Sequence, residues 1–476
     1  MPLIIPANTL SGGYEVANSC RFNDGDSAYL EKNFSSTQDS RRKFTVSAWV
    51  KRSDLITSTN IWGSSEGSGE GYNSLKFENH KLQYLSGNTT NSGTQVNLET
   101  NRLFRDVSAW YHIVLAVDTS QGTDTNRIKL YVNGTQETSF NTSTYPSQDT
   151  DLLTSTTPQM TIGMRDLRGT NAQFFDGYIS EFCFIDNQQL TPSSFGEFDE
   201  DSPTIFKPID VSGLTFGTNG FYLDFENSGS LGADVSGNGN NFTVNNLTSD
   251  DQVIDTPTNN YATLNSLNSW GTTVLSEGNK KITNTTTAFD HTSATIEMNS
   301  GKWYFEFYVV SHTSGYSAIA YFLAGTGTFK NAQTSWITNG DGSFGIGANE
   351  RKITDGVSSN ASFSDLNAGD KVQIAYDSDS GKAWFGINNT WIDSGNPSSG
   401  TNPYFSSTKL QNNDVVLKLV CYDTQGVSVA NFGQDSSFAG NTTKQSNQDS
   451  NSQGNFYYSP PTDFLALNTK NLSEFG

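Results

Sequence analysis

One pattern occurs twice in this chain: an apolar strand ends in Asp, a polar loop follows, and a second strand runs into an Asn-led turn. The first copy spans residues 113–134 and the second spans residues 372–389. Alternation of apolar and polar residues is typical of half-buried strands. The Asn-Gly and Asn-Asn pairs tolerate the positive φ that a tight hairpin turn requires. The pattern predicts two antiparallel hairpins, and therefore two β-sandwiches in tandem.

The composition supports this interpretation. The chain has 476 residues, with 43 Gly, 31 Phe and 19 Tyr, and 12% of its residues are aromatic. Abundant turn residues are typical of all-β proteins, and aromatic side chains bury enough apolar surface for two cores. We predict an all-β fold class of two tandem antiparallel β-sandwiches.

Charge and the N-terminal residues exclude several functions. The chain carries 28 basic and 49 acidic residues, a net charge of −21, which repels nucleic-acid phosphates. The segment 1–6, Met-Pro-Leu-Ile-Ile-Pro, has no basic residue and too short an apolar run for a signal peptide or a membrane span. We expect no nucleic-acid partner, no membrane insertion and no signal peptide. Three scattered cysteines predict buried free thiols, and the alternative is a disulfide between Cys20 and Cys183 on the first and last strands of the first domain.

The first half of the chain carries a family resemblance in six ordered segments. They are "RFNDGDSAYL", "FTVSAWVKR", "WYHIVLAVDT", "IKLYVNG", "IGMRD" and "FFDGYISEFCFID". Together they resemble the laminin-G-like, concanavalin A-like jelly roll over residues 15–195. The resemblance implies a sandwich of two antiparallel sheets that often carries calcium and often binds sugar or protein.

The second half resembles a different family. "GKWYFEF", "DKVQIAYDSDSGKAWFGIN" and "VANFGQ" follow one another as in the SPRY (B30.2) sandwich, which we place at residues 266–440. This resemblance implies binding of proteins or peptides through loops at one end and no characteristic enzymatic activity. The remaining segments are an N-terminal arm (1–14), a connector with short strands (196–265) and a C-terminal tail (441–476). We expect the connector to pack between the domains, and the apolar residues 464–467 to dock back onto the protein or onto a neighbour.

Calcium is the cofactor that the first resemblance suggests. In laminin-G-like folds the first and last strands lie close together, so Asp24, Asp26, Asp176 and Glu181 are candidates to share one structural ion, because calcium prefers clustered oxygen ligands. The alternative is two Asx-type turns without metal.

Aromatic residues in or beside loops are the candidate ligand contacts, because their ring faces stack on sugars or peptide side chains. The alternative for each is packing in the core or at its rim. The candidates are Tyr72, Tyr84, Trp110, Tyr316, Trp336 and Trp391.

Patterns that indicate catalysis are weak. Residues 63–67 fit Gly-x-Ser-x-Gly, but a flexible loop follows where a nucleophile elbow needs a helix. Glu197 and Asp199 resemble the carboxylate pair of concanavalin A-like glucanases, but a second glutamate is missing from the expected place, and a solvated acidic turn is the better interpretation. We predict a protein without enzymatic activity.

The pairing of the two domains, with linking segments such as "GFYLDFENSGSLGADVSGNGNNFTVNN", closely resembles tail-fibre and host-adhesion proteins of marine tailed bacteriophages. It implies a virion protein at the tail fibre or particle exterior, made in the host cytoplasm and binding a host-surface glycan or protein. Other virion proteins are the expected partners, and a homotrimer the expected assembly. One alternative is a capsid-decorating or structural virion protein without receptor binding, and a second is a glycan depolymerase.

Overall fold

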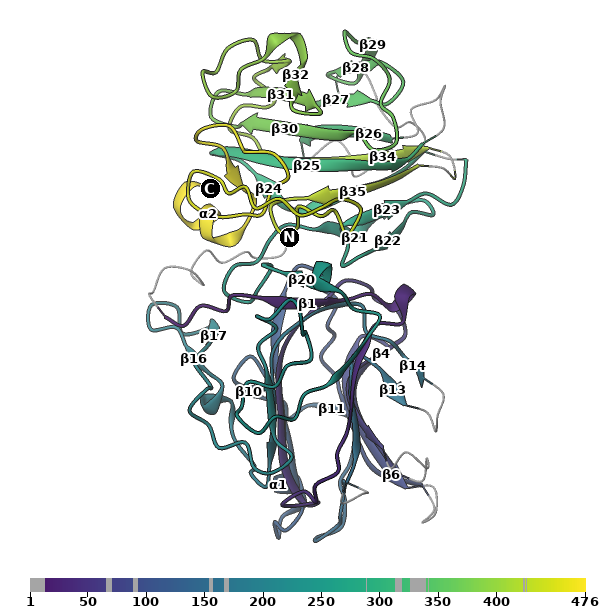
Figure 1. The fold of residues 1–476 in the computed structure, drawn as a ribbon, viewed down its shortest axis with the longest axis vertical. Helices are drawn as coiled ribbons and strands as arrows, with labels where there is room; N and C mark the ends of the chain where they lie inside the picture. The colour runs from purple at the N-terminus through teal and green to yellow at the C-terminus, as the bar shows by residue number, and fades with distance from the viewer. Residues whose placement is uncertain are drawn as a thin grey trace. The chain divides into compact units, whose positions relative to one another are not determined.

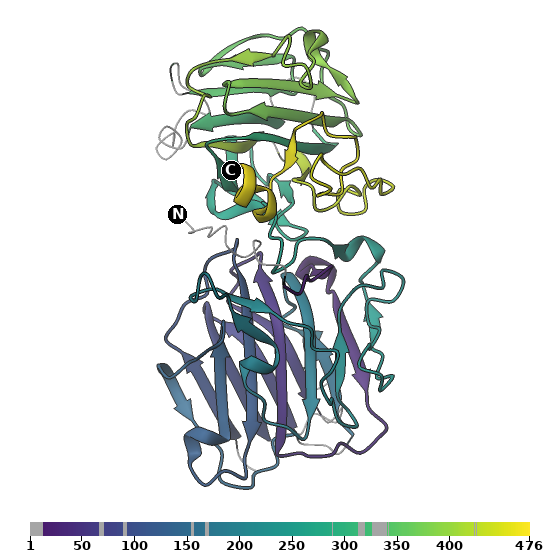
Figure 2. The same cartoon turned by 90° about the vertical axis from the view of Figure 1, so that its left-hand side faces the viewer.

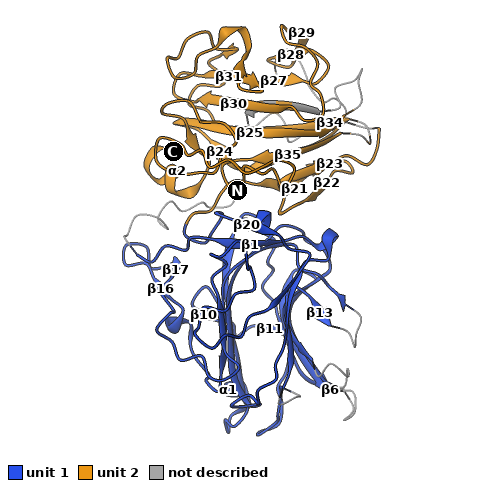
Figure 3. Cartoon of the chain, viewed as in Figure 1, with its two compact units in different colours: residues 1–258 blue, residues 259–476 orange. Residues whose placement is uncertain are grey.

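The computed structural model describes residues 13–65, 71–88, 93–153, 157–166, 171–287, 289–312, 319–325, 340, 342–422, 424 and 426–476. The chain divides into two compact units, unit 1 (Met1–Thr258) and unit 2 (Asn259–Gly476), which Figure 3 shows in separate colours. Both units are built from antiparallel sheets, so the all-β prediction is confirmed.

Unit 1 is a sandwich of two sheets, each with eight strands among the described residues (Figure 1). Sheet A contains, in spatial order, β10 (Thr135–Gln136), β9 (Ile128–Val132), β8 (Trp110–Asp118), β3 (Lys43–Arg52), β15 (Gly177–Asp186), β1 (Ser19–Phe22) and β20 (Gln252–Val253), with β18 (Phe221–Leu223) also pairing with β15. Sheet B contains β11 (Phe140–Thr144), β7 (Gly93–Thr100), β6 (Lys81–Asn88), β5 (Gly71–Glu78), β4 (Ser58–Ser65), β12 (Gln159–Ile162), β2 (Tyr29–Asn33) and β19 (Thr243–Asn245).

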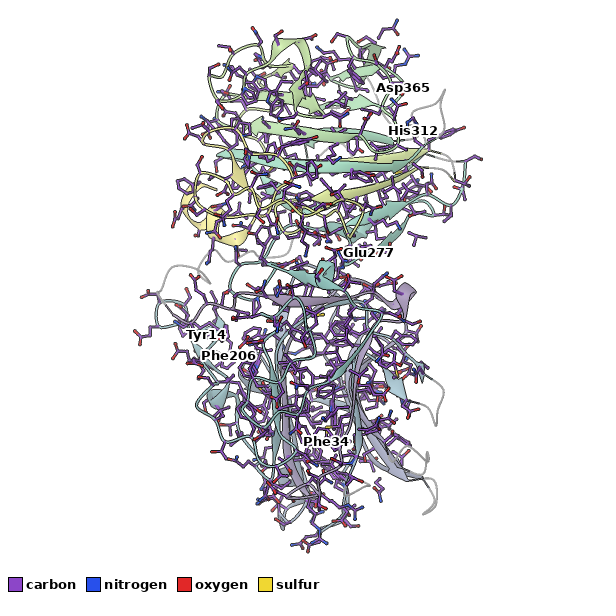
Figure 4. The ribbon with its side chains drawn as sticks, in the orientation of Figure 1. Tyr14, Phe34, Phe206, Glu277, His312 and Asp365 are labelled. Atoms are coloured by element: carbon purple, nitrogen blue, oxygen red, sulfur yellow. The ribbon has the colours of Figure 1, made fainter. Side chains whose placement is uncertain are left out.

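The core of unit 1 lies between these sheets. Alternate residues of β3, Phe44, Val46 and Val50 among them, point inward against Phe77 and other apolar residues of sheet B. Phe34, labelled in Figure 4, belongs to the same core. Period-two alternation places one face of each strand in this layer.

The segment after β15 belongs to unit 1. It forms the hairpin of β16 (Gly196–Phe198) and β17 (Phe206–Pro208), then β18 and β19, which complete the two sheets. In Figure 2 much of this segment crosses the outer face of sheet A. There it covers a second apolar cluster that includes Val114, Ile185 and Tyr222. Residues 196–258 of the expected connector are therefore part of the first sandwich.

Unit 2 is a second sandwich. Sheet C contains β21 (Leu264–Trp270), β24 (Phe289–Met298), β34 (Val415–Tyr422), β26 (Ile319–Gly325), β27 (Ser343–Gly347), β28 (Arg351–Thr354) and β29 (Val357–Asn360). Sheet D contains β22 (Val274–Ser276), β23 (Lys281–Thr283), β35 (Val427–Asn431), β25 (Lys302–Ser311), β30 (Lys371–Asp377), β31 (Lys382–Ile387) and β32 (Thr390–Trp391), with β33 (Phe405–Ser406) and β36 (Leu465–Ala466) pairing at its side.

Helices are short. Among the described residues, the α-helices are α1 (Asp124–Arg127) and α2 (Thr469–Phe475), and the 3-10 turns are Asp24–Asp26, Pro192–Ser194, Ser249–Asp251 and Ile392–Ser394. Among the described residues, no helix is long and apolar enough to cross a membrane.

The repeated sequence pattern forms the two expected hairpins, β8 to β10 and β30 to β32. Asn133 and Gly134 both have positive φ (47° and 77°) in the first hairpin, and Asn388 and Asn389 do so in the second (50° and 64°). Asp118 accepts hydrogen bonds from the backbone and hydroxyl of Ser120, so the Asp-led loop is held as a turn. The repeat therefore forms scaffold in both units.

The C-terminal tail folds back onto unit 2. β36 pairs in parallel with β25, and residues 464–467 are all buried. They are therefore unable to anchor a neighbouring subunit without leaving this site. The apolar residues 3–5 lie outside the described residues.

Candidate functional site

The four carboxylates proposed for calcium do not form one site. Asp24 and Asp26 lie in a 3-10 turn, where Asn23 Nδ2 donates to Asp26 at 2.7 Å. Asp176 precedes β15, and its carbonyl accepts from the Ser53 amide. Glu181 lies further along β15 and binds tyrosines instead. Within the described ranges, no group of three or more His, Cys, Asp or Glu residues is placed to hold a metal ion.

The aromatic candidates differ in burial and in their contacts. Tyr84 is fully buried and donates to Asn73 Oδ1 at 2.7 Å, so it is a core residue that no ligand reaches. Trp110 is half-buried and donates from Nε1 to Asp255 at 3.2 Å. Trp391 is half-buried and lies over Gly386. Tyr316 and Trp336 lie outside the described residues. Tyr72 is half-buried on the outer side of sheet B.

This surface, which we call the polar face, consists of the outward side chains of β4, β5, β6, β7 and β12. Strand register aligns them in rows, because residues directly opposite one another in antiparallel strands point to the same side. One row is Gln159, Ser65, Tyr72 and Gly87, and another is Lys76, Gln83 and Glu99.

The side chains of the polar face hold one another in place. Gln83 Nε2 donates to Asn97 Oδ1 at 2.9 Å, and Lys81 pairs with Glu99 at 3.0 Å. The first bond uses only the oxygen of Asn97, and within the described part of the chain its NH2 group has no partner. A fixed amide whose NH2 group is unused suits the hydroxyl groups of a sugar, which both donate and accept hydrogen bonds.

A short hairpin borders the polar face. β13 (Arg165–Asp166) and β14 (Asn171–Ala172) lie beside β4, on the outer side of sheet B (Figure 1). Asn60 connects this hairpin to β4, because its Nδ2 donates to the Met164 carbonyl and its backbone amide donates to the Gln173 carbonyl, both at 2.8 Å. The hairpin makes one side of the face higher than the other.

Tyr72 and Arg165 form a stacked pair at this border. The Arg165 guanidinium lies 4.8 Å from the centre of the Tyr72 ring. The ring also lies over Gly87, where an added Cβ would come within 2.7 Å of the Tyr72 hydroxyl. Gly87 thus makes room for the ring. Sequence analysis did not identify Arg165 as a site residue. The alternation in "YNSLKFE" does indicate that Tyr72, Ser74, Lys76 and Glu78 share a face.

Two buried glutamates, Glu181 in unit 1 and Glu306 in unit 2, each accept several hydrogen bonds. Glu181 adopts a positive φ of 50° at a bulge in β15, and Tyr222 and Tyr14 both donate to its Oε2, at 2.6 and 3.2 Å. Figure 4 labels Tyr14 on the side of unit 1 that carries β16 and β17. Burial raises the pKa of Glu181 to about 7, although the two phenol hydrogen bonds oppose this shift.

In unit 2, Glu306 is fully buried and accepts from four donors: the Tyr304 hydroxyl, Asn431 Nδ2 and the backbone amides of Tyr457 and Tyr458. Burial raises its pKa to about 7 against these hydrogen bonds. The carboxyl group therefore ties the C-terminal tail to β25, which is a structural role.

Two arrangements resemble catalytic groups but are built into the scaffold. Ser47 Oγ lies 2.9 Å from His112 Nε2, yet both residues are buried beneath Trp49 and Phe206, and burial lowers the pKa of His112 to about 3. Glu197 and Asp199 both pair with Lys207 on the opposite strand of the β16–β17 hairpin.

Asp199 also accepts from the amides of Asp201 and Ser202, so it organises the turn of that hairpin.

Comparison with known proteins finds a family that is similar to much of the first sandwich. Residues 24–194 match the family model described as the concanavalin A-like lectin/glucanases superfamily. That segment is similar to concanavalin A-like domains. The superfamily includes binding proteins and enzymes. No curated protein matches the chain.

Solved structures resemble parts of the chain at low identity. The SPRY domain of human HERC1 is 14% identical, with 35% of this chain and 96% of that chain covered and a TM-score of 0.28. A heptameric SAP-like pentraxin from Limulus polyphemus is 16% identical, with coverages of 38% and 80% and a TM-score of 0.29. A candidate carbohydrate-binding protein from Bacteroides ovatus is 19% identical, with coverages of 49% and 60% and a TM-score of 0.34.

Proposed function

We propose that this chain is a non-enzymatic binding protein that recognises a surface glycan through the polar face of unit 1. The observation that carries the proposal is the aligned row of fixed polar side chains across β5, β6 and β7, with a stacked tyrosine and arginine at one border. The concanavalin A-like family of this unit supports it, because that family includes lectins.

The biological setting that we propose is the exterior of a bacteriophage virion. There the chain acts as a tail-fibre or receptor-binding protein that contacts host-surface glycan, with other virion proteins as its neighbours and a homotrimer as its assembly. This setting rests on the sequence resemblance of the paired domains. A structural ion such as calcium is not required by the polar face, whose fixed contacts are made between side chains.

A panel of immobilised polysaccharides tests the proposed function. The full chain is passed over neutral, uronate-containing and sulfated polymers, and binding is measured by biolayer interferometry. We expect saturable binding to at least one class, and we expect Asn97→Leu to weaken it about fivefold, because one hydrogen bond on the polar face is worth roughly 1 kcal/mol.

The matched control is Asn360→Leu, which removes an amide on the exposed strand β29 of unit 2. It should bind as the wild type does. Equal loss in both variants, or no saturable binding to any class, would count against a glycan site on the polar face.

A further inference from the structure

Arg165 is a half-buried cation whose hydrogen-bonding capacity is unused. Its Nε atom is buried and has no partner, and within the described residues its guanidinium makes no hydrogen bond and no ion pair. A guanidinium has five N–H donors, and leaving buried donors unmet costs free energy. A buried donor without a hydrogen-bond acceptor needs an explanation, and one explanation is a ligand or ion that accepts the hydrogen bond.

Three other arginines of unit 1 have polar partners within the protein. Arg21 forms an ion pair with Asp251 at 2.8 Å, and Arg102 forms one with Glu137 at 2.7 Å. Arg127 donates to three backbone carbonyls. Arg165 differs from these three because, within the described residues, its guanidinium contacts only the Tyr72 ring, and stacking on a ring leaves the N–H edge of the guanidinium free.

The surroundings of Arg165 leave its positive charge available. Its neighbour Glu78 is already neutralised, because Lys76 pairs with it at 2.5 Å and Ser58 donates to it at 2.7 Å. Asp166 accepts from Ser65 at 3.1 Å. The Tyr72 hydroxyl has no hydrogen-bond partner among the described residues, so it is a second donor beside the guanidinium.

From this geometry we infer that Arg165 and Tyr72 form an anion subsite on the polar face, which takes the carboxylate or sulfate group of an acidic sugar. Arginine suits both groups, because its planar fork donates two parallel hydrogen bonds to paired oxygens. The inference rests on the proposed glycan function and names the class of glycan.

The net negative charge of the chain does not favour acidic glycans. A net charge of −21 repels an acidic polymer at long range, although physiological salt screens charges beyond about 8 Å. Preference for an acidic glycan must therefore arise from a local contact. A single arginine that provides it should dominate the preference.

The test compares each acidic polymer with its neutral derivative. The probes are polygalacturonate and its carboxyl-reduced form, and a sulfated galactan and its desulfated form, all measured with the full chain by biolayer interferometry. We expect at least one acidic form to bind about tenfold more tightly than its neutral form, which corresponds to about 1.4 kcal/mol. Whether the preference appears with the uronate or the sulfated pair identifies the anionic group.

Variants then assign the preference to Arg165. Arg165→Gln should abolish the preference, so that the acidic and neutral forms of the polymer bind with equal affinity, and Arg165→Lys should retain part of it, because the charge stays while the fork is lost. Gly87→Ala, which pushes the Tyr72 ring aside, should weaken it without changing any charge. The control Arg351→Gln changes the net charge by the same amount in unit 2 and should have no effect.

The outcomes separate this inference from the proposed function. If wild type binds acidic and neutral forms equally, or if Arg165→Gln keeps the preference, the anion subsite is overturned while glycan binding stands. If no polymer of the panel binds, the proposed function fails and the subsite fails with it. Unchanged unfolding of each variant in urea shows that a loss of binding is not a loss of fold.

Discussion

Lys51 on β3 forms an ion pair with Asp255 at 2.8 Å, and both side chains are buried, with exposed fractions of 1% and 0%. Trp110 Nε1 donates to the other carboxylate oxygen. Asp255 belongs to the segment expected as a connector, so this pair locks that segment onto sheet A. The pair explains why unit 1 continues to Thr258.

Removing one partner of this pair should strongly destabilise unit 1. We expect Lys51→Met or Asp255→Asn to lower the free energy of unfolding by about 3 to 5 kcal/mol, because each leaves an uncompensated buried charge or donor. The double variant Lys51→Met, Asp255→Leu should lose less than either single variant. The three buried cysteines report the result, because Cys20 and Cys183 lie in unit 1 and Cys421 in unit 2. Urea-dependent thiol labelling with mass spectrometry should show earlier labelling of the first two alone.

The raised pKa of Glu181 predicts a pH dependence of unit 1. The carboxyl group titrates near pH 4.5 when unfolded and near pH 7 when folded. Between these values the folded state binds more protons, so this group's contribution is full below about pH 4.5 and is lost as the pH rises through about 7. The shift in pKa corresponds to a contribution of about 3 kcal/mol at most to the free energy of unfolding.

Glu181→Gln should flatten this dependence, because glutamine keeps an acceptor oxygen for Tyr222 and does not titrate. Thiol labelling of Cys183 in urea between pH 4.5 and 8 measures it, with Asp124→Asn on the exposed helix α1 as control. The prediction would be wrong in sign if the free energy of unfolding of the wild type rose with pH over this range and Glu181→Gln removed that rise.

Glu306 should control the C-terminal tail. In Glu306→Gln one carboxylate oxygen becomes an NH2 group that faces a donor of the tail, and we expect a loss of about 2 kcal/mol from the unmet hydrogen bonds. Limited proteolysis should then cut within residues 441–463 faster than in wild type. Glu297→Gln, at an exposed position of β24, should leave the rate unchanged. Equal protection of the tail in Glu306→Gln would show that β36 pairing alone holds it.

The acidic hairpin offers a test of the depolymerase alternative. Because Glu197 and Asp199 are both engaged by Lys207, we expect no release of reducing sugar from any polysaccharide of the panel. Asp199→Asn should weaken the hairpin turn, since its carboxylate accepts two backbone amides. Reducing sugar released by the wild type and lost in Glu197→Gln would establish a glycosidase instead.

Much of the scaffold follows from local sequence patterns. Asn133-Gly134 and Asn388-Asn389 adopt the left-handed turns that their residue types favour, and the strands before them alternate as expected. Such features depend on neighbours in the sequence, so sequence is enough to predict them. The site is different, because Tyr72, Gly87 and Arg165 come from three strands and meet only through register.

Two site residues that sequence analysis placed at the surface point into the protein. Tyr84 and the carboxylate of Glu181 have residue types that suit a surface, but the first points inward by strand parity and the second is carried by a bulge toward two tyrosines. Spacing could have indicated the direction of Tyr84, which lies two residues after the buried Leu82, whereas the bulge that turns Glu181 is not visible in the sequence.

The sequence by itself determined an all-β chain with two sandwiches and their hairpin turns, because alternation and turn chemistry act over a few residues. Only the tertiary structure decided that residues 196–258 complete the first sandwich, that residues 464–467 fold back onto β25, and that Arg165 stacks on Tyr72. These contacts join positions far apart in the chain, and their existence depends on long-range pairing and burial rather than on local preference.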